Sequence, residues 1–180
     1  MRLAPVQDLP RQTGNGGPAV ECARELALGY AGSATTSESM ADSRGAVVMT
    51  RDVTFRASTA ALTGVCVRTG AVAVIPSADT APQWCGQPLD PAATPVVVML
   101  PNDLAGQSAC GQRVELSAAS AGDLVFWSYR DYGDFAPTRV GLALGSNEIV
   151  TAEPTSGQYV RESMPTAADV RVKRVLGAGT

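Results

Sequence analysis

The feature that most constrains the fold is a run of short apolar segments that fills Gly122 to Val175. Each segment ends at turn residues, which is typical of strands in a small antiparallel sheet. Val140, Leu142 and Leu144 alternate with residues of the opposite face, and a Gly-Ser-Asn turn at 145–147 follows them. We therefore predict four strands of one antiparallel sheet, at Leu124–Trp127, Arg139–Leu144, Glu148–Ala152 and Val170–Val175.

The order and spacing of these segments resemble the C-terminal half of the NlpC-type cell-wall endopeptidases, a papain-like cysteine peptidase family. Members show Pro-Gly-Asp-Leu-Val-Phe-Phe, then His-Val-Gly-Ile-Tyr-Leu-Gly, then Ile-His-Ala-Pro. The matching segments here read Ala-Gly-Asp-Leu-Val-Phe-Trp at 121–127, Arg-Val-Gly-Leu-Ala-Leu-Gly at 139–145 and Val-Thr-Ala at 150–152. The preceding segment, from Leu100 to Val114, is also similar to the family. The resemblance implies an α+β, papain-like NlpC-type fold, an antiparallel sheet with helices packed on one side.

The two positions that the resemblance assigns to catalysis hold other residue types. Arg139 stands at the position of the catalytic histidine, and Thr151 stands at the position of the polar residue that orients it. The chain contains no histidine at all. A cysteine nucleophile needs a neighbouring base to remove the thiol proton, and arginine stays protonated. The mechanism of the family therefore cannot operate with these residues.

The position that corresponds to the family's nucleophile has two alternatives. Residues 55–58, Phe-Arg-Ala-Ser, stand where the family has Phe-Asp-Cys-Ser, which would put Ala57 at the cysteine position and a helix over Thr59–Thr69. Counting back from Pro101 with the family's spacing reaches Cys85 instead. Three prolines follow Cys85 and oppose a continuous helix there. Cys85 is then a disulfide partner or a buried thiol, or a nucleophile without an evident base.

The sequence before Leu100 supports several local expectations. A flexible lead-in over 1–17 precedes a single domain over 18–177, which begins with a helix at Pro18–Tyr30. Two later segments are candidate strands, and the second of them is dense in β-branched residues. These segments are Ala46–Phe55 and Gly64–Ile75. A loop over 83–95 and a short buried strand or apolar element over Pro95–Leu100 complete this region.

Composition excludes several classes of protein. With 180 residues, of which 45% are hydrophobic and 17% charged, the chain is long enough for a folded core. The net charge is −3 and the basic residues are dispersed, which argues against nucleic-acid binding. No apolar run is long enough to span a membrane, no signal peptide is visible, and no cofactor is implied.

Four cysteines allow two disulfides, with three possible connectivities, or four buried thiols. They are Cys22, Cys66, Cys85 and Cys110. None of them forms a Cys-x-x-Cys motif, and no histidine is present, so a zinc site is not expected.

A candidate binding face follows from the turn at 145–147. A three-residue turn places Gly141 opposite Thr151 and Arg139 opposite Glu153, and the period of two puts all four on one face. Arg139 and Glu153 then form either a surface ion pair or part of a groove in which Arg139 binds a carboxylate, such as that of a peptidoglycan stem peptide.

An aromatic and charged segment between two predicted strands is a second candidate for ligand binding. It contains Tyr129, Tyr132 and Phe135. Loops of this composition often line a ligand groove, although the aromatic side chains can equally cap a hydrophobic core.

Together these observations predict a non-catalytic NlpC-like domain that binds peptidoglycan peptide or a cell-envelope protein. One alternative is an active cell-wall peptidase or amidase with an atypical cysteine nucleophile. Another is a structural or secretion-associated scaffold. The resemblance implies a secreted or cell-envelope location, where at least two of the four cysteines would form a disulfide.

Overall fold

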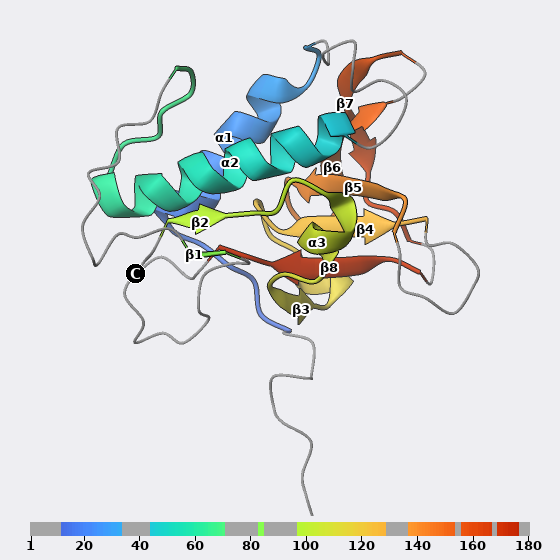
Figure 1. The fold of residues 1–180 in the computed structure, drawn as a ribbon. Coiled ribbons are helices and arrows are strands. Elements are labelled where there is room, and N and C mark those ends of the chain that lie inside the picture. The colour runs from blue at the N-terminus through green and yellow to red at the C-terminus, as the bar shows by residue number, and fades with distance from the viewer. Residues whose placement is uncertain are drawn as a thin grey trace, which may run out of the picture.

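The computed structural model describes residues 12–33, 44–70, 83–84, 97–128, 137–153, 156–166 and 169–176. These residues form an α+β fold in which a six-stranded antiparallel sheet packs against helices (Figure 1). The strand order is β3-β8-β4-β5-β6-β7. The strands are β3 (Gln112–Val114), β4 (Leu124–Trp127), β5 (Arg139–Ala143), β6 (Glu148–Glu153), β7 (Gln158–Ser163) and β8 (Arg171–Arg174).

The four predicted strands are confirmed as β4, β5, β6 and β8, with ends that differ by at most one residue. The β5–β6 hairpin closes as the turn chemistry predicts, because the backbone N–H of Leu144 donates to the carbonyl of Glu148 across residues 145–147 (2.8 Å). Leu142 pairs with Val150 in the resulting register. Strands β3 and β7 were not predicted. β3 is only three residues long, and β7 lies at the sheet edge with a largely exposed or half-exposed surface.

Helix α1 (Pro18–Tyr30) matches the predicted helix at both ends. Pro18 occupies the first turn, where its missing N–H has no intrahelical partner to lose. The buried side chains of α1 are spaced as on one face of a helix. They are Ala19, Val20, Cys22, Ala23, Leu26 and Ala27.

Helix α2 (Arg44–Thr63) shows that the expected strand at Ala46–Phe55 was wrong. Its β-branched residues favour strand locally, but fully or almost fully buried residues recur every three or four positions, at Ala46, Met49, Val53, Ala57 and Ala60. That spacing makes one continuous apolar face when the segment is helical. Burial of this face therefore outweighs the local β propensity.

The segment after α2 also differs from the expectation. The helix ends at Thr63, so the proposed helix over Thr59–Thr69 was wrong, and residues 64–70 contain no strand. Gly64 adopts a φ of 76° and its N–H donates to the carbonyl of Ala60, which ends the helix. Residues 71–75, the rest of the expected strand, lie outside the described residues.

The remaining described elements are short. β1 (Gln83–Trp84) pairs in parallel with β2 (Val98–Met99), so a strand begins within the expected loop at 83–95, whose residues 85–95 lie outside the described residues. β2 falls within the short apolar element expected over Pro95–Leu100. Helix α3 (Leu104–Ser108) begins at Asp103, whose carboxylate accepts from the N–H of Gly106. A 3₁₀ turn, η4 (Leu116–Ala118), follows β3.

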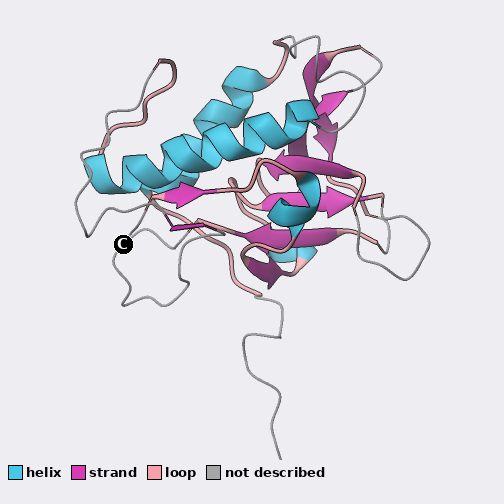
Figure 2. Ribbon diagram, viewed as in Figure 1, coloured by secondary structure: helices cyan, strands magenta, loops and turns pink. Residues whose placement is uncertain are grey.

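The two faces of the sheet are covered differently (Figure 2). Helices α1 and α2 pack on one face, where their apolar residues contact Leu124 and Phe126 of β4 and Val140 and Leu142 of β5. The other face holds a smaller cluster, which includes Val125, Trp127, Ala143, Ile149 and Val172 together with Met164 and Val170. The expectation that the helices α1 and α2 pack on one side is confirmed.

A buried ion pair joins β8 to the start of β4. Arg174 donates to both carboxylate oxygens of Asp123 (3.0 and 2.8 Å), and the two side chains are only 4% and 1% exposed. Burial raises the pKa of Asp123, and the hydrogen bonds from Arg174 oppose that change. Arg174 also donates to the carbonyl of Thr13, and the side-chain amide of Asn15 donates to the carbonyl of Leu176. Residues 13–15, assigned to the lead-in from sequence, therefore hydrogen-bond to the folded domain.

All of the described cysteines are disulfide-bonded. Cys22 of α1 is bonded to Cys66 in the segment that follows α2, with the two Cα atoms 5.5 Å apart. Cys110 is also disulfide-bonded, and its partner lies outside the described residues. The prediction that at least two of the four cysteines pair is thus met by Cys22 and Cys66. None of the helices in the described part of the chain is long and apolar enough to cross a membrane.

Candidate functional site

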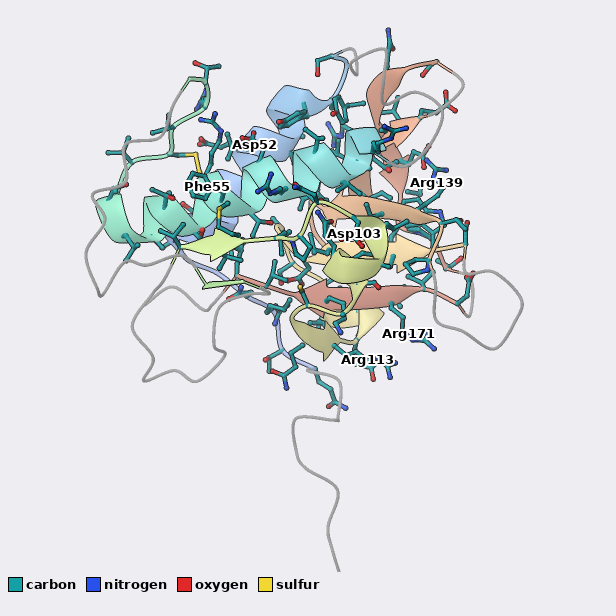
Figure 3. The ribbon with its side chains drawn as sticks, viewed as in Figure 1. Asp52, Phe55, Asp103, Arg113, Arg139 and Arg171 are labelled. Atoms are coloured by element: carbon teal, nitrogen blue, oxygen red, sulfur yellow. A yellow bond between two sulfur atoms is a disulfide. The ribbon has the colours of Figure 1, made fainter. Side chains whose placement is uncertain are left out.

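Arg139 lies at the start of β5, on the face of the sheet opposite α1 and α2. Its register partner is Trp127 of β4, and its guanidinium carbon lies 5.0 Å from the centroid of the Trp127 ring, a cation–π contact. One terminal nitrogen donates to the carbonyl of Ala152 (3.1 Å). Figure 3 shows Arg139 at the end of the sheet, well away from Asp52 and Phe55 of α2. The side chain is therefore fixed against its own sheet.

Thr151 lies on the neighbouring strand, and its hydroxyl is occupied. The side chain is 1% exposed, and its Oγ1 donates to the carbonyl of Val140 (2.7 Å). The observed β5–β6 register, in which Ala143 pairs with Ile149, places Gly141 opposite Thr151 when it is continued along the strands. The single hydroxyl proton is used in this buried bond, so toward another side chain the hydroxyl could act only as an acceptor.

Glu153 is the next residue of this candidate face. It is the last residue of β6, and its carboxylate accepts from the backbone N–H of Ser156 (2.6 Å). Arg139 at the start of β5 and Thr151 and Glu153 at the end of β6 thus lie at the same end of this strand pair. Each of the three side chains is hydrogen-bonded to a backbone group, and none of these three bonds links one side chain to another in a catalytic arrangement.

Gly141 is the residue that allows Trp127 to lie on this face. A Cβ at position 141 would lie 2.9 Å from Cδ1 of Ile149 and 3.3 Å from Cζ3 of Trp127. Both contacts are shorter than ordinary van der Waals separations. The absence of a side chain at Gly141 therefore leaves room for the indole, over which Arg139 stacks.

Of the other predicted positions, one is buried in a helix and the rest are not among the described residues. Ala57 is fully buried in the interior of α2, so it does not begin a nucleophile helix and that assignment was wrong. Cys85, Tyr129 and Tyr132 lie outside the described residues.

A second candidate site, which the sequence interpretation missed, is a groove of about 440 Å³ along α2. One wall is the helix surface that points away from the core, and the other is formed by Met99 and Asn102. The α2 residues that line it include Arg44, Val48, Arg51 and Phe55, at helical spacings of four, three and four. Because this segment was expected to be a strand, its outer helical face was not recognised. The signal that was available is the three- and four-residue spacing of its apolar positions.

A polar network behind this groove connects α1, α2 and the segment after α2. The hydroxyl of Tyr30 donates to Asp52 (2.7 Å), and Nε of Arg56 donates to the same carboxylate (2.8 Å). Arg56 also donates to the carbonyls of Val67 and Gly70. Burial, and then the hydrogen bond to Asp52, raise the pKa of Tyr30 well above its ordinary value, so the phenol remains a donor at neutral pH.

No protein-family model matches the chain, and no curated protein matches it. Within the described residues, no group of three or more cysteine, aspartate or glutamate side chains is arranged to hold a metal ion.

Proposed function

We propose that the chain is a non-catalytic domain of the NlpC type, with a papain-like fold, that binds a peptide of the cell envelope. The observation that supports the loss of catalysis is the state of Arg139 and Thr151. The first is stacked on Trp127 and bonded to a backbone carbonyl, and the second is bonded to the carbonyl of Val140. Both positions that the resemblance assigns to catalysis thus have structural roles.

Proton transfer is the physical reason why this arrangement would be inactive. Cleavage of a peptide by a thiol needs a group that first accepts the thiol proton and then protonates the leaving amine. Imidazole serves both steps because its pKa lies near neutrality. The guanidinium of Arg139 cannot accept a proton, and the chain has no histidine that could replace it.

The proposed ligand is the peptide stem of peptidoglycan, bound through one of its carboxylates. Arg139 is half-buried, and the bond to Ala152 uses one of its five N–H donors. Its planar guanidinium is suited to bidentate recognition of a carboxylate. The disulfide between Cys22 and Cys66 is consistent with an oxidising compartment such as the cell envelope or the exterior.

The test is co-sedimentation of the purified chain with insoluble peptidoglycan, together with an assay for release of stem-peptide fragments. We expect binding without cleavage, and we expect Arg139→Gln to reduce the bound fraction. Arg161→Gln is the matched control, because Arg161 is an exposed arginine that pairs with Glu148 on the face of the sheet opposite to Arg139. Turnover that Cys85→Ala abolishes would show an active enzyme, and no sedimentation would favour a scaffold.

A further inference from the structure

The groove along α2 presents alternating cationic and apolar side chains. Arg44 and Arg51 are one heptad apart, as are Val48 and Phe55, so each pair is separated by about 10 Å along the helix axis. Val48, in the second turn of α2, is 57% exposed and lines the groove. Met99 adds a further half-exposed apolar side chain from the opposite wall.

The two walls of the groove are held at a fixed separation by buried or half-buried hydrogen bonds. Nε of Arg51 donates to the carbonyl of Leu100 (3.1 Å), and the N–H of Val98 donates to Ser58 (2.9 Å). The side-chain amide of Gln107, which is fully buried, donates to the carbonyls of Val47 and of Pro101. The groove therefore exists before any ligand binds, which reduces the entropic cost of binding.

The charge of the groove is positive, although the chain as a whole has a net charge of −3. Its lining contains two arginines and one acidic residue, Asp52. The carboxylate of Asp52 is already bonded to Arg56 and to the hydroxyl of Tyr30. Arginines therefore outnumber acidic side chains two to one in this lining, and the complementary ligand is anionic.

We propose that this groove is a docking site for an acidic amphipathic helix of a partner protein. Such a helix would place large apolar side chains against Val48 and Phe55 and carboxylates against Arg44 and Arg51. The matching spacing on the partner is the same four, three and four residues, because two helices that run side by side share a heptad repeat. Arg139 does not line this groove, and the proposal does not rest on the proposed binding of peptidoglycan by Arg139.

The first experiment measures binding of a fluorescein-labelled synthetic helix by fluorescence anisotropy. The probe has glutamate and leucine at the stated spacing on an alanine and glutamine background, and a second probe replaces each glutamate by lysine. We expect the chain to bind the glutamate probe and to bind the lysine probe at least about tenfold more weakly. No binding of the glutamate probe, or equal binding of the two probes, would overturn the proposal.

A matched pair of variants locates the site. Val48→Glu introduces a carboxylate into the groove, whereas Val65→Glu introduces it at a position of equal exposure outside the groove, 58% against 57%. We expect only Val48→Glu to weaken binding of the glutamate probe, by about tenfold or more. Equal loss in both variants would contradict the assignment. Circular dichroism of both variants checks that the fold is retained.

A charge reversal provides a gain of binding that damage to the fold cannot imitate. Arg44→Glu lies in the first turn of α2, where a negative charge is favourable to the helix. We expect this variant to lose affinity for the glutamate probe and to gain affinity for the lysine probe. Equal affinity of the variant and the unmodified chain for both probes would exclude Arg44 from the site and refute the proposal.

Two other occupants would be detected by the same variants. If the groove binds a second copy of the chain, multi-angle light scattering should show a dimer that Val48→Glu converts to a monomer. If it binds an alkyl carboxylate, decanoate should displace a dye from the groove while the glutamate probe does not bind. Either result would overturn a docking site for a partner helix.

Discussion

The helical half and the sheet half of the molecule are stabilised by different kinds of interaction. Helix α1 is joined covalently to the segment after α2 through Cys22 and Cys66, and to α2 by the hydrogen bond from Tyr30 to Asp52, which also pairs with Arg56. The sheet is joined across β8 and β4 by the buried pair of Arg174 and Asp123. A disulfide stabilises the fold largely by lowering the conformational entropy of the unfolded chain. Removal of one partner of a buried ion pair destabilises the folded state instead, because the other charge stays buried without compensation. The two halves should therefore respond differently to single substitutions.

The largest effect is expected in the sheet. Asp123→Ala would leave the guanidinium of Arg174 buried without its carboxylate, and it should lower the free energy of unfolding by about 3–5 kcal/mol. The matched change at an exposed pair is Glu148→Ala, which removes the partner of Arg161 and should cost less than about 1 kcal/mol. Urea denaturation measures both. Similar losses at the two pairs would show that burial does not distinguish them.

The next effect concerns the covalent link of the helical half. The double variant Cys22→Ala/Cys66→Ala removes a cross-link between residues 44 positions apart, and it should lower the free energy of unfolding by about 2–4 kcal/mol. Far-ultraviolet circular dichroism should still show both helices below the transition. An unchanged unfolding midpoint would mean that packing of α1 on α2 holds this half without the disulfide.

A smaller effect is expected on the Arg139 face. Gly141→Ala would place a Cβ against Ile149 and Trp127, and it should cost about 1–3 kcal/mol. Gly145→Ala is the control, because a Cβ at Gly145 meets no atom within 4 Å and the position has no positive φ. Thermal unfolding compares the two variants. A neutral result for Gly141→Ala would mean that the indole can move aside.

The smallest effect is a gain of stability in the helical half. Oγ1 of Thr54 is buried and has no hydrogen-bond partner among the described residues, so Thr54→Val should raise the free energy of unfolding by about 1 kcal/mol. Thr50→Val is the contrast, because the hydroxyl of Thr50 donates to Gln107 (2.7 Å). That variant should be destabilised. A loss of stability in Thr54→Val would indicate that its hydroxyl has a partner in the folded protein.

The sheet half was largely predictable from sequence because its contacts are local. Strand β4 is a continuous apolar run, and the β5–β6 hairpin is set by a three-residue turn and by alternation. These signals also gave the register that brings Arg139, Thr151 and Glu153 to one end of the sheet. They did not reveal that Arg139 stacks on Trp127, since that contact joins two strands whose connection has no periodic pattern.

The helical half was less predictable because its signals conflict. The β-branched residues of α2 favour a strand. The segment is helical because α1 and the sheet pack against one of its faces and bury Met49 and Val53 there. The groove depends further on Gln107, which is distant in sequence and bridges α2 to Pro101. A single buried side chain of this kind leaves no pattern in the sequence.

The sequence by itself determined the positions of four strands, the hairpin register and the absence of a histidine base, because each depends on local alternation or on residue identity. The tertiary structure decided that the segment from Arg44 to Thr63 is a helix, that Asp123 and Arg174 pair in the interior, and that Arg139 is bonded to its own sheet. These features depend on contacts between residues far apart in the chain. Their energies come from burial in the assembled fold, which no local pattern encodes.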